Sequence, residues 1–344
     1  MKQKEWMQEK KETTRPLKGV VILIMGTLLL FFSFALSVSF GAADFNVRTV
    51  WQAILHFDPN IQSHQIIWEL RLPRMVGAAI VGGAFAVSGA LMQGMTRNPL
   101  ADSGLLGLNA GAVFMLACCF AFFPDLSYMY VILFSFLGAA LGAGIVYGVG
   151  SLSTNGLTPV RLVLAGAAVS ALLAALSEGI ALYYEIGQDL AFWYAGGVSG
   201  TTWFQLKIIT PWLLLALIGA VSLSRSITLL SLGEEVAVGL GEKTARVKLL
   251  AAFIIVILAG MAVSVVGAVS FVGLIVPHIV RRFVGHDYRW IIPASLIFGA
   301  LLVVLADLAA RTLNPPYETP VGALIALLGV PFFLYLARKG GGVV

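Results

Sequence analysis

The chain has 344 residues, of which 59% are hydrophobic and only 11% charged, and its formal net charge is +5. Soluble domains carry about 25% charged residues, so this sequence has too few charged side chains to cover a water-exposed surface. The composition therefore excludes a soluble protein and indicates an integral membrane protein. Most Lys and Arg residues lie in the N-terminal tail and in short connectors, so membrane orientation explains the positive charge better than nucleic-acid binding does.

Ten apolar segments follow one another along the chain, and about 20 residues are needed to cross the hydrocarbon core. We predict spans at 18–41, 72–94, 104–123, 128–151, 161–184, 206–226, 247–267, 268–280, 289–311 and 320–337. The eighth is short and ends at Pro277-His278, so we expect protein rather than lipid to surround it. The predicted fold class is an all-α integral membrane protein with about ten transmembrane helices. Residues 18–337 form one membrane domain between the tails 1–17 and 338–344.

The distribution of Lys and Arg predicts that both termini are cytoplasmic. This orientation leaves Arg71-Leu72-Pro73-Arg74 outside, against the positive-inside rule. Pro73 suits the first position of a helix, which puts Arg74 in the first turn, where the helix dipole makes a cation mildly unfavourable. Two interpretations stay open, namely snorkelling to lipid headgroups and an external docking site for an acidic partner.

The second span contains small residues that allow close approach of neighbouring helices. They are Gly82, Gly83, Ala86, Gly89 and Ala90.

The connector at about 228–248 has the pattern of a folded helix–turn–helix. Ser231 and Glu234 are spaced as a capping box, and Gly239 or Gly241 can end the short helix that follows. A juxtamembrane amphipathic helix is the alternative. The string GLGEKT at 239–244 lacks the ending of a phosphate loop and follows no strand. We therefore expect no nucleotide, cofactor or metal to be bound by this chain.

Two further polar positions lie inside predicted spans. Asp307 precedes Arg311 by one helical turn, and we expect an ion pair between them that is structural or that supports docking. His278 has no spaced partner, so a hydrogen-bonded structural histidine is favoured over a metal ligand.

For three further residues inside predicted spans, two roles remain possible. Glu178 lies mid-span, where a charge is costly and usually functional, although a protonated, hydrogen-bonded carboxyl is an equal alternative. Met92 and Gln93 either line a path through the membrane or pack in the core.

Several long strings occur in a fixed order after RLPR. They are QGMTRNPLADSGLLGLNAGA (93–112), RLVLAG (161–166), SLGEEVAVGLG (231–241), GAVSFVGLIVPHIVRRFVGHDYRWIIPAS (267–295) and ADLAARTLNPPYETPVGALIALLGVPFFLYL (306–336). With these strings the chain resembles the permease subunit of the iron–siderophore, vitamin B12 and haem class of ABC importers. The family fold is a ten-helix subunit that dimerises around a central translocation path.

The resemblance implies roles for particular residues. Arg71, Arg74 and Arg311 match arginines that meet glutamates on the two lobes of a solute-binding protein, where a guanidinium grips a carboxylate with two parallel hydrogen bonds. Each exposed pair of this kind contributes only about 0.2–1 kcal/mol. The segment 228–248 matches the coupling helices that enter a cleft of the ATPase subunit. The coupling residues are Ser231, Gly233, Glu234, Glu235 and Gly239, and the inner gate is placed near Thr158, Pro159 and Val160.

The resemblance further implies a multi-pass subunit of the cell membrane that takes ferric siderophores from the external solute-binding protein. Its partners would be a second permease subunit, identical or homologous, and two ATPase subunits that hold the ATP-Mg. Haem or a corrinoid is the alternative cargo within the class.

Two rival functions come from other classes. An ion-coupled secondary transporter concentrates ionisable residues at the midplane, but this chain offers only Glu178 and Asp307. An intramembrane serine protease would use Ser199, in the string Gly197–Gly200, with His278 as base. The predicted topology separates those two residues by a bilayer, whereas proton transfer needs about 2.6–3.2 Å.

Overall fold

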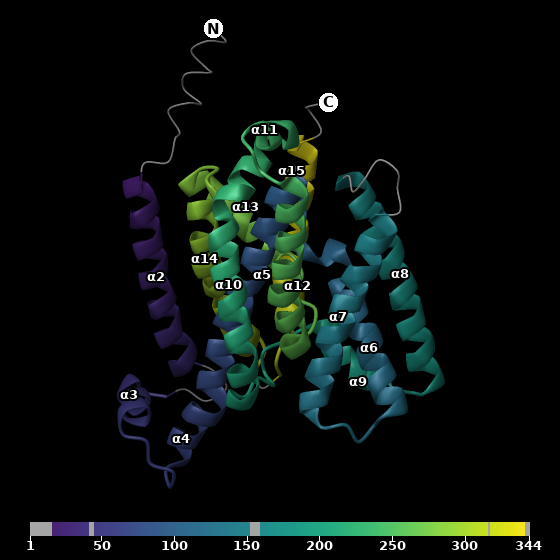
Figure 1. Cartoon of the computed structure of the whole chain (residues 1–344). Coiled ribbons are helices and arrows are strands. Elements are labelled where there is room, and N and C mark those ends of the chain that lie inside the picture. The colour runs from purple at the N-terminus through teal and green to yellow at the C-terminus, as the bar shows by residue number, and fades with distance from the viewer. Residues whose placement is uncertain (1–15, 41–44, 152–158, 316, 341–344) are drawn as a thin grey trace.

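The computed structural model describes residues 16–40, 45–151, 159–315 and 317–340, and these residues form helices and connectors without a β-strand. Figure 1 shows the arrangement. The ten main helices are α2 (Pro16–Ser39), α5 (Leu72–Thr96), α6 (Leu108–Phe122), α7 (Tyr128–Ser151), α8 (Pro159–Tyr183), α10 (Trp203–Ser231), α12 (Thr244–Val266), α13 (Val272–Val284), α14 (Tyr288–Thr312) and α15 (Val321–Gly340). They correspond one to one with the predicted spans.

Seven helices in the described part of the chain are long and apolar enough to cross a membrane, and α6 and α15 are shorter apolar helices. The one main helix not yet counted, α13, has only 13 residues. The sequence did not predict the short elements of the connectors. These are α3 (Val47–Leu55), α4 (Gln62–Gln65), a π-helical turn (Ile66–Arg71), a 3-10 turn (Ser103–Leu106) and α9 (Gly187–Ala195). The short helix predicted to end at Gly239 or Gly241 is present as α11 (Glu234–Gly239).

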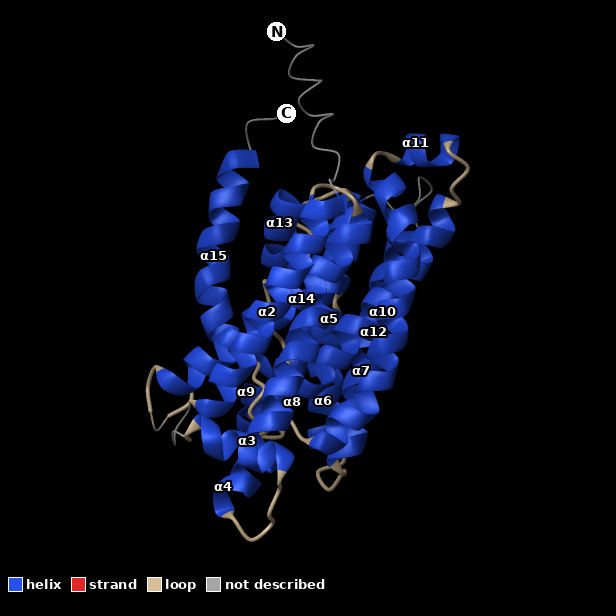
Figure 2. Cartoon of the chain, turned by 90° about the vertical axis from the view of Figure 1, so that its left-hand side faces the viewer, coloured by secondary structure: helices blue, strands red, loops and turns tan. Residues whose placement is uncertain are grey.

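Helix α5 forms the centre of the molecule, and its most apolar 18-residue window is 83% buried. Helices α10, α12, α13 and α14 pack directly around it, and α2 packs on the outside of α14. Helices α6 to α9 form a second group that contacts the first mainly through α12. In Figure 1 this second group stands beside the first, and α8 runs along most of the height of the bundle. Figure 2 shows the same helices turned by 90°, with α11 at one end and α3 and α4 at the other.

Glycine pairs set the closest helix contacts. A Cβ on Gly82 of α5 would meet the carbonyl oxygen of Gly299 on α14, and a Cβ on Gly111 of α6 would meet that of Gly138 on α7. Only glycine permits backbones to approach this closely, which maximises van der Waals contact where no hydrophobic effect drives association. The predicted packing role of the small residues in the second span is confirmed, because all five are buried.

The eighth span differs from its prediction. Helix α13 begins at Val272, because Gly267 ends α12 with φ 73° and ψ −164° and the backbone stays non-helical up to Phe271, whose φ is 69°. The amide of Ala268 donates to the carbonyl of Trp193 (3.0 Å), and that of Gly197 to the carbonyl of Val266 (2.8 Å). Non-helical backbone at membrane depth is tolerated only when protein satisfies it. The expectation that protein surrounds this segment is confirmed.

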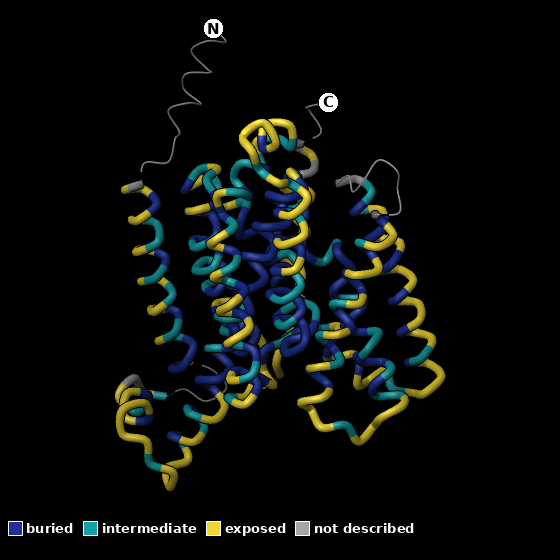
Figure 3. The backbone as a smooth tube through the Cα atoms, viewed as in Figure 1, coloured by how far each residue is buried: buried dark blue, intermediate teal, exposed yellow. Residues whose placement is uncertain are grey.

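The outer surface of the bundle is apolar. In Figure 3 exposed residues follow the outer faces of α2 and α8, whereas α5 is buried along its length. Large exposed hydrophobic residues such as Leu28, Phe31 and Leu172 are suited to lipid or to another membrane subunit. Helix α2 begins, and α15 ends, at the same end of the bundle as α11, whereas α3 and α4 lie at the opposite end (Figure 1).

Candidate functional site

The beginning of α5 carries two arginines that the structure buries. Arg71 is the last residue of the π-helical turn, and Arg74 follows Pro73 in the first turn of α5. They are 8% and 9% exposed, and Arg311 near the end of α14 is 8% exposed. The three arginines are therefore buried in this structure, because each guanidinium has partners inside the chain.

Arg74 joins two carboxylates. Its Nε donates to Asp307 Oδ1 (2.8 Å), and its Nη1 donates to Glu318 Oε1 (2.7 Å). Asp307 is completely buried on α14, whereas the side chain of Glu318, in the connector before α15, is 48% exposed. A buried charge is tolerated only when it is paired, so Arg74 and Asp307 compensate each other. Glu318 adds a contact that solvent can reach.

Arg311 completes this cluster. Its Nη2 lies 3.2 Å from Asp307 Oδ2, which confirms the ion pair predicted from the spacing of one helical turn. The same nitrogen donates to the carbonyl (3.1 Å) and the hydroxyl (2.8 Å) of Ser37 on α2. Two arginines thus share one buried aspartate, and Glu318 brings the cluster to a formal charge of zero.

Arg71 binds the end of α2. Its Nη1 donates to the carbonyls of Val38 (2.6 Å) and Ser39 (3.1 Å), and its guanidinium lies 4.4 Å from the ring centroid of Phe45. The last four carbonyls of a helix have no partner within it and carry partial negative charge. Arg71 and Arg311 therefore cap the C-terminus of α2, which explains why cations are stable at the beginning of α5.

A small cavity of about 140 Å³ adjoins Arg74 and Glu318. The segments 195–199 and 319–321 complete its wall, and Ser199 is among the lining residues. His278 lies instead in the latter half of α13, where its ring packs edge-on against Phe332 at 5.6 Å between centroids. The structure places Ser199 and His278 in different surroundings and does not bring the two side chains together.

His278 also differs from its expected role. Its Nδ1 is buried without a hydrogen-bond partner among the described residues, so the expected hydrogen bond is not found at that atom. The described residues contain no group of three His, Cys, Asp or Glu side chains placed to hold a metal ion.

Helix α11 lies at the other end of the bundle, and it is held differently from the prediction. Ser231 is the last residue of α10 and donates to the carbonyl of Thr228 (2.7 Å). Gly233, with φ 135°, precedes α11, which has no side-chain cap. The predicted capping box is therefore wrong, because α10 continues through the position that a cap would need.

Glu234 fixes α11 to α12. Lys248 Nζ donates to both carboxylate oxygens of Glu234, at 2.7 and 2.8 Å. These hydrogen bonds hold the pKa of the Glu234 carboxyl below its usual value. Ser226 also donates to Glu242 Oε1 (3.0 Å), which ties the end of the α11 connector back to α10.

The outward side of α11 is unusually apolar for a segment outside the spans. Val236, Val238 and Leu240 are all exposed, together with Glu235 and Gly239. An exposed apolar patch of this kind beyond the lipid-facing helices is typical of a protein interface.

The end of α10 is hydrogen-bonded to the beginning of α14. Thr228 Oγ1 accepts a hydrogen bond from the amide of Tyr288 (3.0 Å), and Tyr288 Oη also contacts Arg281 Nη2 at 3.3 Å. Arg281 Nη2 donates to Gln93 Oε1 (2.9 Å), and Gln93 Nε2 donates to the carbonyl of Gly273 (3.1 Å). The sequence analysis missed this network, because Gln93 and Arg281 are 188 positions apart and their hydrogen bond leaves no local sequence pattern.

The predicted path residues lie in different environments. Met92 and Gln93 are buried in the core of the chain, and their role in a path stays a prediction. Thr158 lies outside the described residues. Pro159 and Val160 are in the first turn of α8. Glu178 is exposed on α8, where it lines an open cavity of about 860 Å³ with Glu185 of the following connector and with residues of α8 and α9.

Residues 29–339 match the FecCD transport family, which is more than half of the chain. The chain belongs to the FecCD transport family. This establishes the resemblance that the sequence strings indicated.

Named FecCD relatives cover nearly the whole chain. The iron(3+)-hydroxamate import system permease protein FhuB of Bacillus subtilis is 52% identical over 332 residues, which is 96% of this chain and 86% of the relative. The ferric enterobactin transport system permease protein FepD of Escherichia coli is 39% identical over 91% of this chain and 93% of its own. The hemin transport system permease protein HmuU of Yersinia pestis is 37% identical over 88% and 91%.

A solved structure has the same fold. It is described as an inward-facing conformation of a putative metal-chelate type ABC transporter, and it superposes with a TM-score of 0.81 at 30% identity. The match covers 92% of this FecCD chain and 99% of the other. The all-helical permease fold is therefore shared along the whole length of that chain.

Proposed function

We propose that this chain is the membrane-spanning permease subunit of an ABC importer that carries ferric siderophores, and that hydroxamates are its preferred class. One observation carries the proposal, namely 52% identity to an iron(3+)-hydroxamate permease over 96% of the chain. The hemin permease, at 37% identity, supports haem as a second candidate cargo.

The geometry supports two separate contact regions. The arginine cluster lies at the end of the bundle that carries α3 and α4, and the apolar face of α11 lies at the opposite end (Figure 1). We assign the first end to the outside, where a solute-binding protein docks, and the second to the cytoplasm, where the two ATPase subunits bind ATP-Mg. A second permease copy or homologue completes the path.

Docking at Arg71, Arg74 and Arg311 must accommodate their burial. Arg74 already bonds a carboxylate, Glu318, that is half exposed at the rim of the small cavity. We propose that a glutamate of the solute-binding protein replaces Glu318 on Arg74. Such an exchange keeps Asp307 paired, so no buried charge is left without a partner.

On the cytoplasmic side, Val236, Val238 and Leu240 supply the apolar contact to the ATPase. The Glu234–Lys248 pair and the Thr228–Tyr288 bond would transmit displacement of α11 to α12 and α14. The cycle is a shift between outward- and inward-open states that the partners bind with different affinity.

Uptake of radiolabelled iron tests the function directly. Cells that lack the chromosomal copy are complemented with this chain and given ferric hydroxamate, ferric catecholate or haem. We expect hydroxamate uptake that requires the partner ATPase and survives collapse of the membrane gradient. Uptake that depended on the gradient and persisted without the ATPase would contradict the proposal in favour of a secondary transporter.

A further inference from the structure

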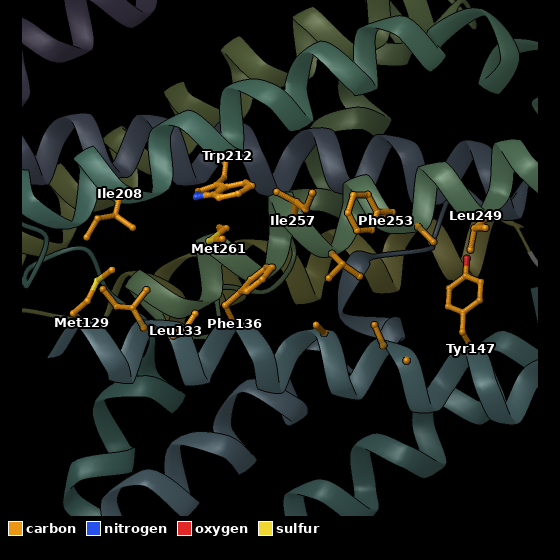
Figure 4. Close-up of a pocket in the computed structure, with 16 residues that line it drawn as sticks. Met129, Leu133, Phe136, Tyr147, Ile208, Trp212, Leu249, Phe253, Ile257 and Met261 are labelled. Carbon is orange, nitrogen blue, oxygen red and sulfur yellow. The ribbon is translucent and has the colours of Figure 1, made fainter. Parts of the chain in front are cut away.

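A long apolar groove runs along the outside of this chain, between α7 on one side and α10 and α12 on the other. Its volume is about 660 Å³, within the range of pockets that hold small molecules. Figure 4 shows Met129, Leu133 and Phe136 of α7 facing Met261, Ile257 and Phe253 of α12 across the open space, with Ile208 and Trp212 of α10 above them. The function proposed above does not use this groove.

The dimensions of the groove fit a chain-like ligand. From Met129 to Tyr147 its lining follows five turns of α7, about 27 Å at 1.5 Å per residue. That length is close to the roughly 30 Å thickness of the hydrocarbon core. The groove therefore runs in the direction of lipid acyl chains and over most of their depth.

The chemistry of the lining excludes a polar occupant. The sixteen lining residues include no charged side chain, and the hydroxyl of Tyr147 lies within hydrogen-bond distance of Met95 Sδ (3.6 Å). A ferric chelate exposes polar or charged oxygen atoms, which would lose their hydration here without compensation. An acyl chain has no polar atoms and therefore loses no hydration when it enters the groove.

One end of the groove offers a cation. Leu249, Phe253 and Val256 line it from one face of α12. Arg246 precedes Leu249 by three residues and Phe253 by seven, so it lies on the same face one turn nearer to α11. Arg246 is exposed, and no ion pair joins it to another described residue. Its neighbour Lys248 differs, because both of its bonds go to Glu234.

We propose that this groove is a binding site for an anionic phospholipid. An acyl chain lies between α7 and α12, and the phosphate binds Arg246 at the level of the headgroups on the α11 side. Basic residues at the mouth of a crevice between membrane helices are the expected recognition element for such headgroups. The lipid would fill the seam between the α6–α9 group and the rest of the molecule. This proposal does not depend on the cargo or the transport function.

The test measures lipid retained by the purified full-length chain in native mass spectrometry, after exchange into detergent with phosphatidylglycerol or phosphatidylcholine. We expect the wild type to retain phosphatidylglycerol preferentially. Gly144→Leu should abolish retention of both lipids, because no atom lies within 4 Å of a Cβ at Gly144 and a larger side chain would occupy the groove. Ile145→Phe enlarges an exposed side chain on the same helix outside the groove and should leave retention unchanged.

The headgroup contact is tested separately. Arg246→Gln should reduce phosphatidylglycerol retention roughly fivefold, since one basic residue near an anionic headgroup contributes about that much. Phosphatidylcholine retention should fall less, because its choline cation offsets the charge of its phosphate. Arg225→Gln, which removes an exposed cation of α10 outside the groove lining, is the control.

Three results would overturn the proposal. The first is a monodisperse Gly144→Leu protein that retains lipid like the wild type. The second is an Arg246→Gln protein with an unchanged ratio of the two lipids. The third is displacement of the bound lipid by a ferric hydroxamate, which would assign the groove to the cargo instead.

Discussion

Arg74 and Asp307 are 233 positions apart in the sequence, yet a 2.8 Å hydrogen bond between them joins the beginning of α5 to the last third of α14. Arg311 shares the same carboxylate, so a single aspartate compensates two buried guanidiniums. The cluster connects three helices, because Arg311 also donates a hydrogen bond to the hydroxyl of Ser37 on α2.

Asp307→Asn should destabilise the chain strongly. The substitution leaves Arg74 and Arg311 without their buried counter-charge, a loss that typically costs about 3–5 kcal/mol. The melting temperature of the detergent-purified protein, followed by size-exclusion chromatography, measures the effect. Glu318→Gln is the control, because it removes only the half-exposed partner of Arg74. Equal melting temperatures for Asp307→Asn and wild type would show that the cluster is not structural.

Glu318→Gln should instead strengthen docking. With its internal competitor neutralised, Arg74 is available to a carboxylate of the solute-binding protein, and the gain is at most about fivefold because the pair is partly exposed. Surface plasmon resonance with the permease in nanodiscs measures the affinity. A weaker or unchanged affinity would mean that Arg74 does not receive the partner's carboxylate, while leaving the transport function itself intact.

Lowering the pH should destabilise the attachment of α11 to α12. The pKa of Glu234 is lowered by Lys248, so the pair stabilises the fold above the ordinary glutamate pKa of about 4.3, and this contribution is lost as the pH falls through the lowered value. Protection factors of the α11 amides, measured by hydrogen exchange in nanodiscs, should decline by less than about fivefold over that range, because the pair is partly exposed. Glu234→Gln should show the reduced protection at neutral pH and no further acid dependence. Acid dependence that persisted in this variant would assign it to another group.

Gly82→Ala should separate α5 from α14. The added methyl group would meet the carbonyl oxygen of Gly299 and the side chain of Val303, and overpacking of this kind costs about 1–3 kcal/mol. The same substitution at Gly144 provides a matched control, since that position is open and alanine favours a helix over glycine by about 1 kcal/mol. Thermal unfolding of both variants should therefore shift in opposite directions. An unchanged unfolding temperature for Gly82→Ala would mean that α5 and α14 can move apart without loss of stability.

The sequence predicted the membrane helices well, because apolar length is a local property. Nine of the ten spans agree with helices to within a few residues, and the eighth is displaced because Gly267 and Phe271 adopt positive φ, which hydropathy does not register. The amphipathic α3 was missed because its nine residues are too short for a span. A true capping box occurs at Thr202 and Gln205, where the spacing was visible but was not used.

The candidate sites were only partly predictable. The pairing of Asp307 with Arg311 followed from helical spacing, whereas Glu318 and Lys248 emerged only from the fold, because nothing local links them to Arg74 or Glu234. Burial of the arginines was unpredictable for a related reason. Their main partners include backbone carbonyls of α2, and a carbonyl is present at every residue and so carries no sequence signal.

The capping of α2 by distant arginines has a consequence for biosynthesis. Helix α2 leaves the ribosome before α14, and its apolar window is only 17% buried even in the finished fold. The carbonyl of Ser37 receives Arg311 only after some 270 further residues have been translated. During synthesis Arg71 can therefore cap the end of α2 early, through the carbonyls of Val38 and Ser39, whereas the contact to Ser37 forms only when α14 has been made.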